Sequence, residues 1–77
     1  MANRPADYKR VVDAITEQIR TGESTPGDKL PTYAQLAAQF KVSVTTAQNA
    51  LRLLRDRGII EGHQGKGTYV AEHPPLT

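Results

Sequence analysis

Apolar and polar positions in the first third of the chain follow the period of an α-helix. Five apolar side chains fall on one helical face, namely Tyr8, Val11, Val12, Ile15 and Ile19. Charged residues occupy most of the positions between them, as expected where one face is buried and the other meets water. The pattern predicts an amphipathic helix, with Pro5 and Asp7 suited to its start and Gly22 to its end.

The middle of the chain predicts two further helices joined by a short turn. Thr32 and Gln35 fit a capping box, in which a hydroxyl and an amide side chain each satisfy the other residue's backbone N–H. Ser43 can cap the next helix, and Gly58 is placed to end it in the left-handed conformation. The inward-facing residues of the two helices are Leu36, Ala37, Phe40, Ala47, Ala50, Leu51 and Leu54.

Beyond Gly58 the pattern becomes that of short β-strands. Residues 59–61 and 68–70 are rich in β-branched and aromatic side chains, and the glycine-rich segment 62–67 lies between them. This predicts a hairpin with its loop at 62–67. Lys29-Leu30, which follows a turn signal at residues 25–28, could add a very short strand.

The element order of helix, helix, tight turn, helix and hairpin predicts an α+β fold of the winged helix-turn-helix class. A chain of 77 residues is long enough for one small domain. We place this domain at residues 7–71, between a flexible N-terminus (1–6) and a flexible tail or linker stub (72–77).

Composition excludes several other classes of protein. Cysteine is absent, which excludes disulfides and thiolate metal sites. No apolar run approaches the roughly 20 residues that span a bilayer, and the N-terminus lacks a signal-peptide core. We therefore expect a cytoplasmic protein with no membrane association.

Catalytic and cofactor chemistry has no support in the sequence. No nucleophile–base pair can be assembled, and the glycine-rich segment 62–67 does not fit the phosphate-binding P-loop pattern. A metal site at His63 would need partners, and His73 is the only other histidine. We expect neither enzymatic activity nor a cofactor or metal ion.

Charge is distributed unevenly along the chain. The net charge is only +2, and residues 1–40 carry five basic and five acidic side chains. Residues 41–70 carry five basic side chains against two acidic ones. The positive excess therefore lies in the C-terminal half, where a nucleic-acid interface would require it, although an ordinary solvated surface would fit the charge equally well.

The outward face of the third predicted helix is the main candidate site. Its residues are mostly small and polar, which suits the major groove of duplex DNA: Val44, Thr45, Thr46, Gln48, Asn49 and Arg52. Ser43 and the first amides of this helix can meet a phosphate at the positive end of the helix dipole.

Other candidate contacts lie outside that face. Thr32 and the hydroxyl of Tyr33 can reach the DNA backbone, as can Lys29 and Lys41. Arg55 and Arg57 are placed to offset the dipole at the C-terminus of the third helix.

The motifs in this order resemble the GntR family of bacterial transcription regulators over about residues 8–70. They are Pro26-Gly27-Asp28-Lys29-Leu30-Pro31, Leu36-Ala37, Val42-Ser43, Ala50-Leu51, Leu54, Gly58 and Gly65-Lys66-Gly67-Thr68-Tyr69-Val70. The resemblance implies a repressor that binds a palindromic operator as a homodimer. It places helix 43–57 in the major groove and the wing 62–67 at the minor groove. The wing residues expected at DNA are His63, Gln64, Gly65 and Lys66.

The sequence departs from the family pattern at three positions where arginines are common, which here hold Ala34, Val44 and Gln48. Arginine paired with guanine is the commonest specific contact in the major groove. Gln48 could instead read adenine, and Val44 could touch a thymine methyl group. We therefore expect an operator that depends less on guanine than is usual for the family.

The same departure motivates an alternative function. A winged helix without these arginines could serve as a protein-interaction module or as an accessory, non-specific DNA-binding module. Family members normally carry a C-terminal effector domain, and this sequence extends only just past the wing. No small-molecule effector site is expected within it.

Overall fold

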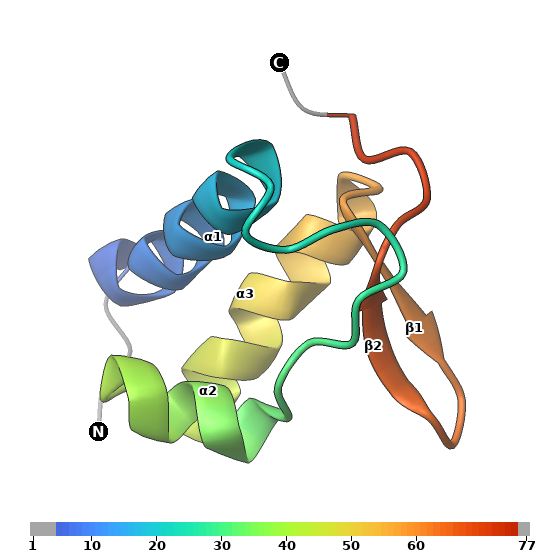
Figure 1. Ribbon diagram of the computed structural model, residues 1–77. Coiled ribbons are helices and arrows are strands. Elements are labelled where there is room, and N and C mark those ends of the chain that lie inside the picture. The colour runs from blue at the N-terminus through green and yellow to red at the C-terminus, as the bar shows by residue number, and fades with distance from the viewer. Residues whose placement is uncertain (1–4, 76–77) are drawn as a thin grey trace.

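Three helices precede a two-stranded antiparallel sheet (Figure 1) in the computed structural model, which describes residues 5–75. The elements are α1 (Pro5–Arg20), α2 (Tyr33–Phe40), α3 (Val44–Asp56), β1 (Ile60–His63) and β2 (Gly67–Val70). The predicted α+β winged helix-turn-helix fold is confirmed. The first helix begins at Pro5, inside the N-terminal segment expected to be flexible. Residues 1–4 and 76–77, to which that expectation also applied, lie outside the described residues.

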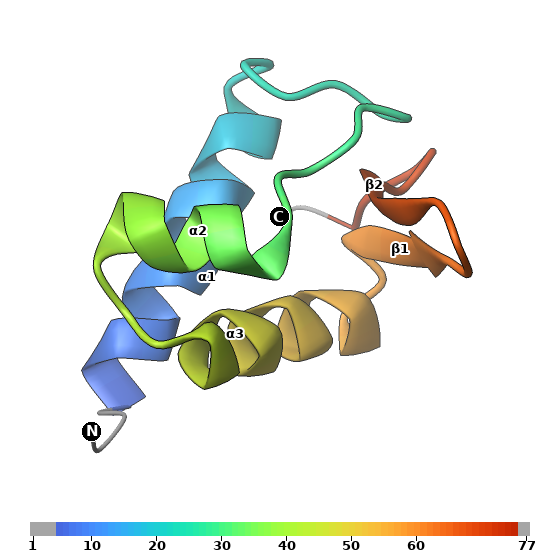
Figure 2. The same cartoon turned by 90° about the horizontal axis from the view of Figure 1, so that it is seen from below.

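The helices pack around α3, which contacts α1, α2 and β1. Figure 2 shows α2 beside the N-terminal half of α3 and β1 beyond its C-terminal end. Ala47 and Ala50 are 0 % exposed, and their small side chains let the neighbouring helices approach α3 closely. The larger core side chains around them include Val11, Ile15, Leu36, Leu51, Leu54 and Ile60. Burial of one full face fixes the rotation of α3, so its opposite face must point to solvent.

Both predicted N-caps are present. The Thr32 hydroxyl accepts from the Gln35 amide (3.1 Å), and the Gln35 side chain accepts from the Thr32 amide (2.8 Å). At α3, the Ser43 hydroxyl accepts from the Thr46 amide at 3.0 Å. Gly58 follows the C-cap of α3 with φ +77°, the left-handed conformation predicted from the sequence.

The turn between α2 and α3 carries one conformation that the sequence did not predict. Lys41 adopts φ 57° and ψ 47°, and it is the only non-glycine residue with positive φ in the described part of the chain. Side chains in this left-handed region crowd the following carbonyl group. The tight turn between the two helices is therefore made at some conformational cost.

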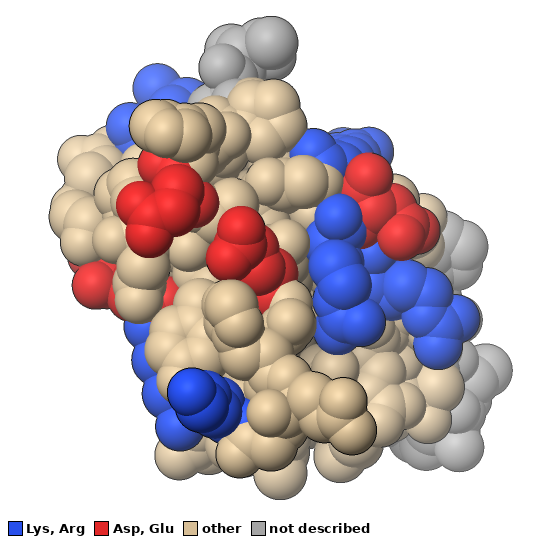
Figure 3. All heavy atoms as spheres, turned by 90° about the vertical axis from the view of Figure 1, so that its right-hand side faces the viewer, with Lys and Arg blue, Asp and Glu red and all other residues tan. Residues whose placement is uncertain are grey.

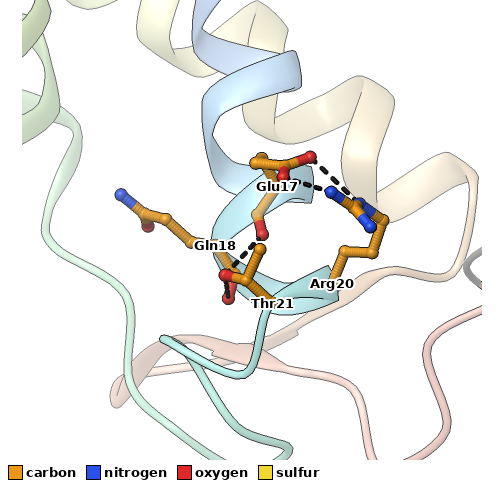
Figure 4. A network of polar contacts seen from close by, with 4 residues as sticks. All are labelled: Glu17, Gln18, Arg20 and Thr21. Carbon is orange, nitrogen blue, oxygen red and sulfur yellow. Dashed lines mark hydrogen bonds and ion pairs between the residues drawn. The ribbon is translucent and has the colours of Figure 1, made fainter.

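The C-terminal end of α1 is fixed by local polar contacts, shown in Figure 4. The Thr21 hydroxyl donates to the carbonyl of Glu17 at 3.0 Å. The Arg20 guanidinium donates to both carboxylate oxygens of Glu17. The hydrogen bonds from Arg20 and its positive charge lower the pKa of the Glu17 carboxyl group. Arg20 is thereby paired within α1.

The hairpin is longer than predicted and its loop is shorter. The two strands pair from Ile60↔Val70 to His63↔Gly67, so the expected loop 62–67 is wrong at both ends and contains only residues 64–66. The Lys66 amide donates to the His63 carbonyl at 2.9 Å, and Gly65 has φ +76°. A positive φ at this third turn position is characteristic of a type II turn. The backbone pairing includes Gly62, because the hydrogen bonds between strands are made by backbone groups and require no side chain.

A third backbone segment extends the sheet beside β2. Leu30 donates to the Thr68 carbonyl at 2.8 Å, and Val70 donates to the Asp28 carbonyl at 2.8 Å. Lys29 and Tyr69 form an isolated antiparallel bridge between these bonds, so the very short strand expected at Lys29-Leu30 is reduced to a single bridge at Lys29. The segment that leads into α2 therefore fixes the hairpin to the helical body.

Candidate nucleic-acid interface

The exposed face of α3 carries most of the predicted reading residues. Thr45, Gln48, Asn49 and Arg52 are exposed, and Val44 is 45 % exposed, the only large apolar side chain described as exposed in residues 7–75. They follow one another along one side of a helix whose other side is buried. The face offers amide, hydroxyl and methyl groups, with one cation at Arg52.

Thr46 does not belong to this face. Its side chain is 1 % exposed, and the Ser43 hydroxyl donates to its hydroxyl oxygen at 3.0 Å. The expectation that Thr46 contacts DNA is therefore wrong for its side chain, which instead packs beneath the start of α3. Ala50 and Leu54 follow Thr46 at intervals of four on the same buried face, a signal that could have placed it correctly.

Ser43 is half-buried at the start of α3, and its hydroxyl serves the helix itself through Thr46. The positive end of the helix dipole and the first N–H groups of α3 lie next to it. The N-terminus of α3 thus combines an ordered cap with partial positive charge, as a phosphate contact would require.

The tip of the wing is exposed at each residue predicted to meet DNA, His63, Gln64, Gly65 and Lys66. His63 Nε2 lies 3.3 Å from Glu61 Oε1, and its ring meets that of Tyr69 edge-on with centroids 5.0 Å apart. These contacts hold the His63 side chain at the wing's outer face. Gln64 and Lys66 flank Gly65 in the turn itself.

The start of α2 adds two predicted residues. Thr32 is exposed and Tyr33 is half-buried. The hydroxyl of Tyr33 accepts a hydrogen bond from Arg55 Nη2 at 3.3 Å. This contact links α2 with the C-terminal half of α3. The sequence pattern predicted for Arg55 only a role in offsetting the helix dipole.

An open hollow of about 630 Å³ separates the wing from the start of α2. Its lining includes Thr32, Tyr33, Arg55, Gly62 and Lys66. Figure 3 views the molecule from the hairpin side and shows basic side chains in separate groups, with acidic ones beside some of them. The basic surface is therefore discontinuous. Local groups of cations indicate a DNA contact better than the net charge of the chain does.

No group of three or more His, Cys, Asp or Glu side chains in residues 5–75 could hold a metal ion. No helix in this range is long and apolar enough to cross a membrane.

Three helices with an exposed third helix and an adjacent β-hairpin define a winged helix-turn-helix domain of the kind found in transcription regulators. The model of the family described as bacterial regulatory proteins, gntR family, matches residues 7–70. The chain belongs to this family, which confirms the resemblance drawn from its motifs.

Named relatives support the assignment. The chain is 47 % identical over 72 residues to the mannosyl-D-glycerate transport/metabolism system repressor of Escherichia coli, which covers 94 % of this chain and 30 % of that protein. It is 46 % identical over 65 residues to the histidine utilization repressor of Klebsiella aerogenes, covering 84 % and 27 %. The chain thus spans less than a third of the length of these two curated relatives.

Solved structures share the fold. A GntR family transcriptional regulator from Listeria monocytogenes superposes with a TM-score of 0.84 at 36 % identity, covering 95 % of this chain and 63 % of that one. AraR(DBD), solved in complex with operator ORR3, gives a TM-score of 0.81 at 37 % identity and covers 84 % and 78 %. The latter is a protein of this fold bound to its operator.

Proposed function

We propose that this domain binds duplex DNA sequence-specifically and regulates transcription, as a repressor, with α3 in the major groove and the wing at the minor groove. The observation that carries the proposal is the division of α3 into two faces. Leu51 and Leu54 are 0 % exposed, whereas Gln48 and Asn49 point to solvent. A helix held rigidly by one face can present the other to base edges at fixed positions. Such a domain acts where the bacterial chromosome lies, in the cytoplasm.

The chemistry of the exposed face favours A·T base pairs. The amide of Gln48 can accept from and donate to the N6 and N7 edge of adenine. The methyl groups of Val44 and Thr45 can contact the methyl group of thymine. Arg52 lies one turn after Gln48 on α3 and can contact a guanine or a phosphate. The operator that we propose is therefore less dependent on guanine than one read by several arginines.

The wing extends the contact beyond α3. The turn 64–66 is narrow because Gly65 carries no side chain, and it is flanked by Gln64 and Lys66. These two side chains can bind phosphates on either side of the minor groove. His63 at the end of β1 supplies a further donor next to the same turn.

We further propose that two copies bind a palindromic operator. Two copies related by a two-fold axis would read the same bases twice, which matches the symmetry of a palindrome. The relatives named as repressors support the assignment of repression, and the operator complex of AraR(DBD) supports binding to an operator.

Selection from random duplex DNA, followed by sequencing and by affinity measurements over a range of salt concentrations, tests this function. We expect a palindromic consensus with A·T pairs opposite Gln48 and an affinity that falls steeply with salt. A guanine-rich half-site would contradict the reading assigned to Gln48. Salt-sensitive binding without a consensus would indicate a non-specific accessory role, and absence of binding at low salt would favour a protein-interaction module.

A further inference from the structure

The hollow between the wing and the start of α2 is bordered by three cationic side chains from three parts of the fold. Lys29 comes from the segment before α2, Arg55 from the C-terminal half of α3, and Lys66 from the wing turn. In Figure 1 the green segment that enters α2 runs beside the hairpin, and the Lys29–Tyr69 bridge holds the two together. Residues distant in the sequence are therefore brought around one opening.

In the described part of the chain, the hollow itself is free of acidic side chains. The described residues that line the hollow include no Asp or Glu. Glu61 and Glu72 line a second depression, which shares Lys66 with the hollow, and Glu61 is paired there with His63. None of the ion pairs among residues 7–75 involves Lys29, Arg55 or Lys66. The hollow therefore favours an anion.

Arg55 is held between the start of α2 and the wing. One of its terminal nitrogens donates to the Tyr33 hydroxyl at 3.3 Å. A Cβ atom at Gly62 would lie 3.5 Å from its guanidinium carbon, so the side chain extends across the wing at a position where β1 has no side chain. A guanidinium has five N–H donors, and the bond to Tyr33 is the only hydrogen bond of the Arg55 guanidinium found among residues 5–75. Its remaining donors are available to a ligand.

Lys29 is held against the other face of the wing, the face that also carries Tyr69, with which it pairs. Its Cε atom lies 3.0 Å from the position of a Cβ atom at Gly67, so a side chain at Gly67 would displace it. Two glycines of the hairpin, Gly62 and Gly67, thus leave room for one cation on each face. Both glycines lie in strands and outside the turn 64–66, so the room that they leave for Arg55 and Lys29 is separate from turn formation.

We propose that the hollow binds one phosphodiester group of the DNA backbone, with Arg55 as its main ligand and Lys66 beside it. The inference rests on the proposed function. With α3 in the major groove and the wing at the minor groove, the strand that separates the two grooves must pass between these elements. The planar fork of arginine matches the geometry of a phosphate group. Such a contact fixes the orientation of the domain on DNA without reading a base.

The test compares R55Q with R57Q on a duplex recovered by the selection, using fluorescence anisotropy at several salt concentrations. R55Q keeps a donor for Tyr33 and removes the charge. We expect it to bind about tenfold more weakly, with the slope of log affinity against log salt reduced by about one and an unchanged base preference. R57Q removes an exposed cation that does not line the hollow, and it should keep the wild-type slope.

Two further measurements separate a phosphate contact from a purely structural role. R55K keeps the charge but loses the fork, so it should restore the salt slope while recovering only part of the affinity. The thermal midpoints of R55Q and R55K should match the wild-type value. Wild-type slope and affinity in R55Q would overturn the phosphate site alone, as would a changed base preference. Failure of the wild-type protein to bind any duplex would overturn the proposed function as well.

Discussion

The Ser43 hydroxyl bridges the backbone amide and the side-chain hydroxyl of Thr46, accepting from the first and donating to the second, each at 3.0 Å. One side chain thus caps α3 and satisfies a hydroxyl that is 1 % exposed. The start of the proposed reading helix depends on this pair.

Ser43→Ala should lower the free energy of unfolding by about 1–2 kcal/mol, because it removes an N-cap and a partner of a buried hydroxyl. Urea denaturation measures the effect. T45A, which truncates an exposed neighbour in the same turn, is the matched control and should leave stability almost unchanged. Equal stability of S43A and T45A would show that the cap contributes little.

Gln48→Ala should weaken binding to the selected operator by about 1–3 kcal/mol and relax the preference at one base pair in each half-site. Q48R should shift that preference to guanine, since arginine pairs with its O6 and N7 atoms. Repeating the selection with each variant measures both effects. Q18A, the same truncation on α1, should retain the wild-type consensus. An unchanged consensus in Q48A would remove Gln48 from the reading face.

Lys41→Gly should raise the free energy of unfolding by about 0.5–1 kcal/mol, since glycine adopts the left-handed conformation without the penalty borne by other residues. K41A is the control, because alanine keeps a Cβ atom and should give no gain. The comparison by chemical denaturation isolates the backbone contribution. A gain in K41A equal to that in K41G would assign the effect to the lysine side chain instead.

Asp28→Asn should destabilise the protein at neutral pH and progressively less in acid. The Thr25 amide donates to Asp28 Oδ2 at 2.9 Å, and this hydrogen bond, followed by that of the Thr25 side chain, lowers the pKa of Asp28 from its ordinary value of 3.8. A carboxyl group whose pKa is lower in the folded state stabilises the fold above the unfolded value. That contribution is lost as the pH falls through the folded value.

Thermal unfolding of wild type and D28N between pH 7 and pH 2 measures this dependence. The difference between their midpoints should be constant near neutrality and shrink below about pH 4. A difference that persists undiminished at pH 2 would show that the carboxylate charge is not its cause.

The helices could be predicted because their signals are local. The capping box at Thr32 and the buried stripe of α3 each depend on spacings of three or four residues. Thr46 was misplaced because its hydroxyl suggested the polar face, although its position four residues before Ala50 places it on the apolar one. At Thr46 the helical spacing is therefore a better guide to burial than the polarity of the side chain.

The hollow could not be predicted because its members are distant in the sequence. Nothing local shows that Arg55 reaches Tyr33, or that Lys29 lies against Gly67. The sequence also did not predict the backbone pairing of Gly62 with Thr68. Backbone N–H and C=O groups form this pairing, and they are the same for almost every residue type. The site residues whose contacts depend on tertiary packing required the structure.

The pairing of β2 with the segment before α2 also has a consequence for the order of folding. The bond from Leu30 to Thr68 closes a long loop of chain, which carries an entropic cost that local helical contacts avoid. We expect the helices to associate first and the hairpin to dock last. Amide hydrogens of residues 67–70 should therefore exchange faster than those of Leu51 and Leu54. The faster exchange would report an opened state in which the wing separates from the intact helices without global unfolding.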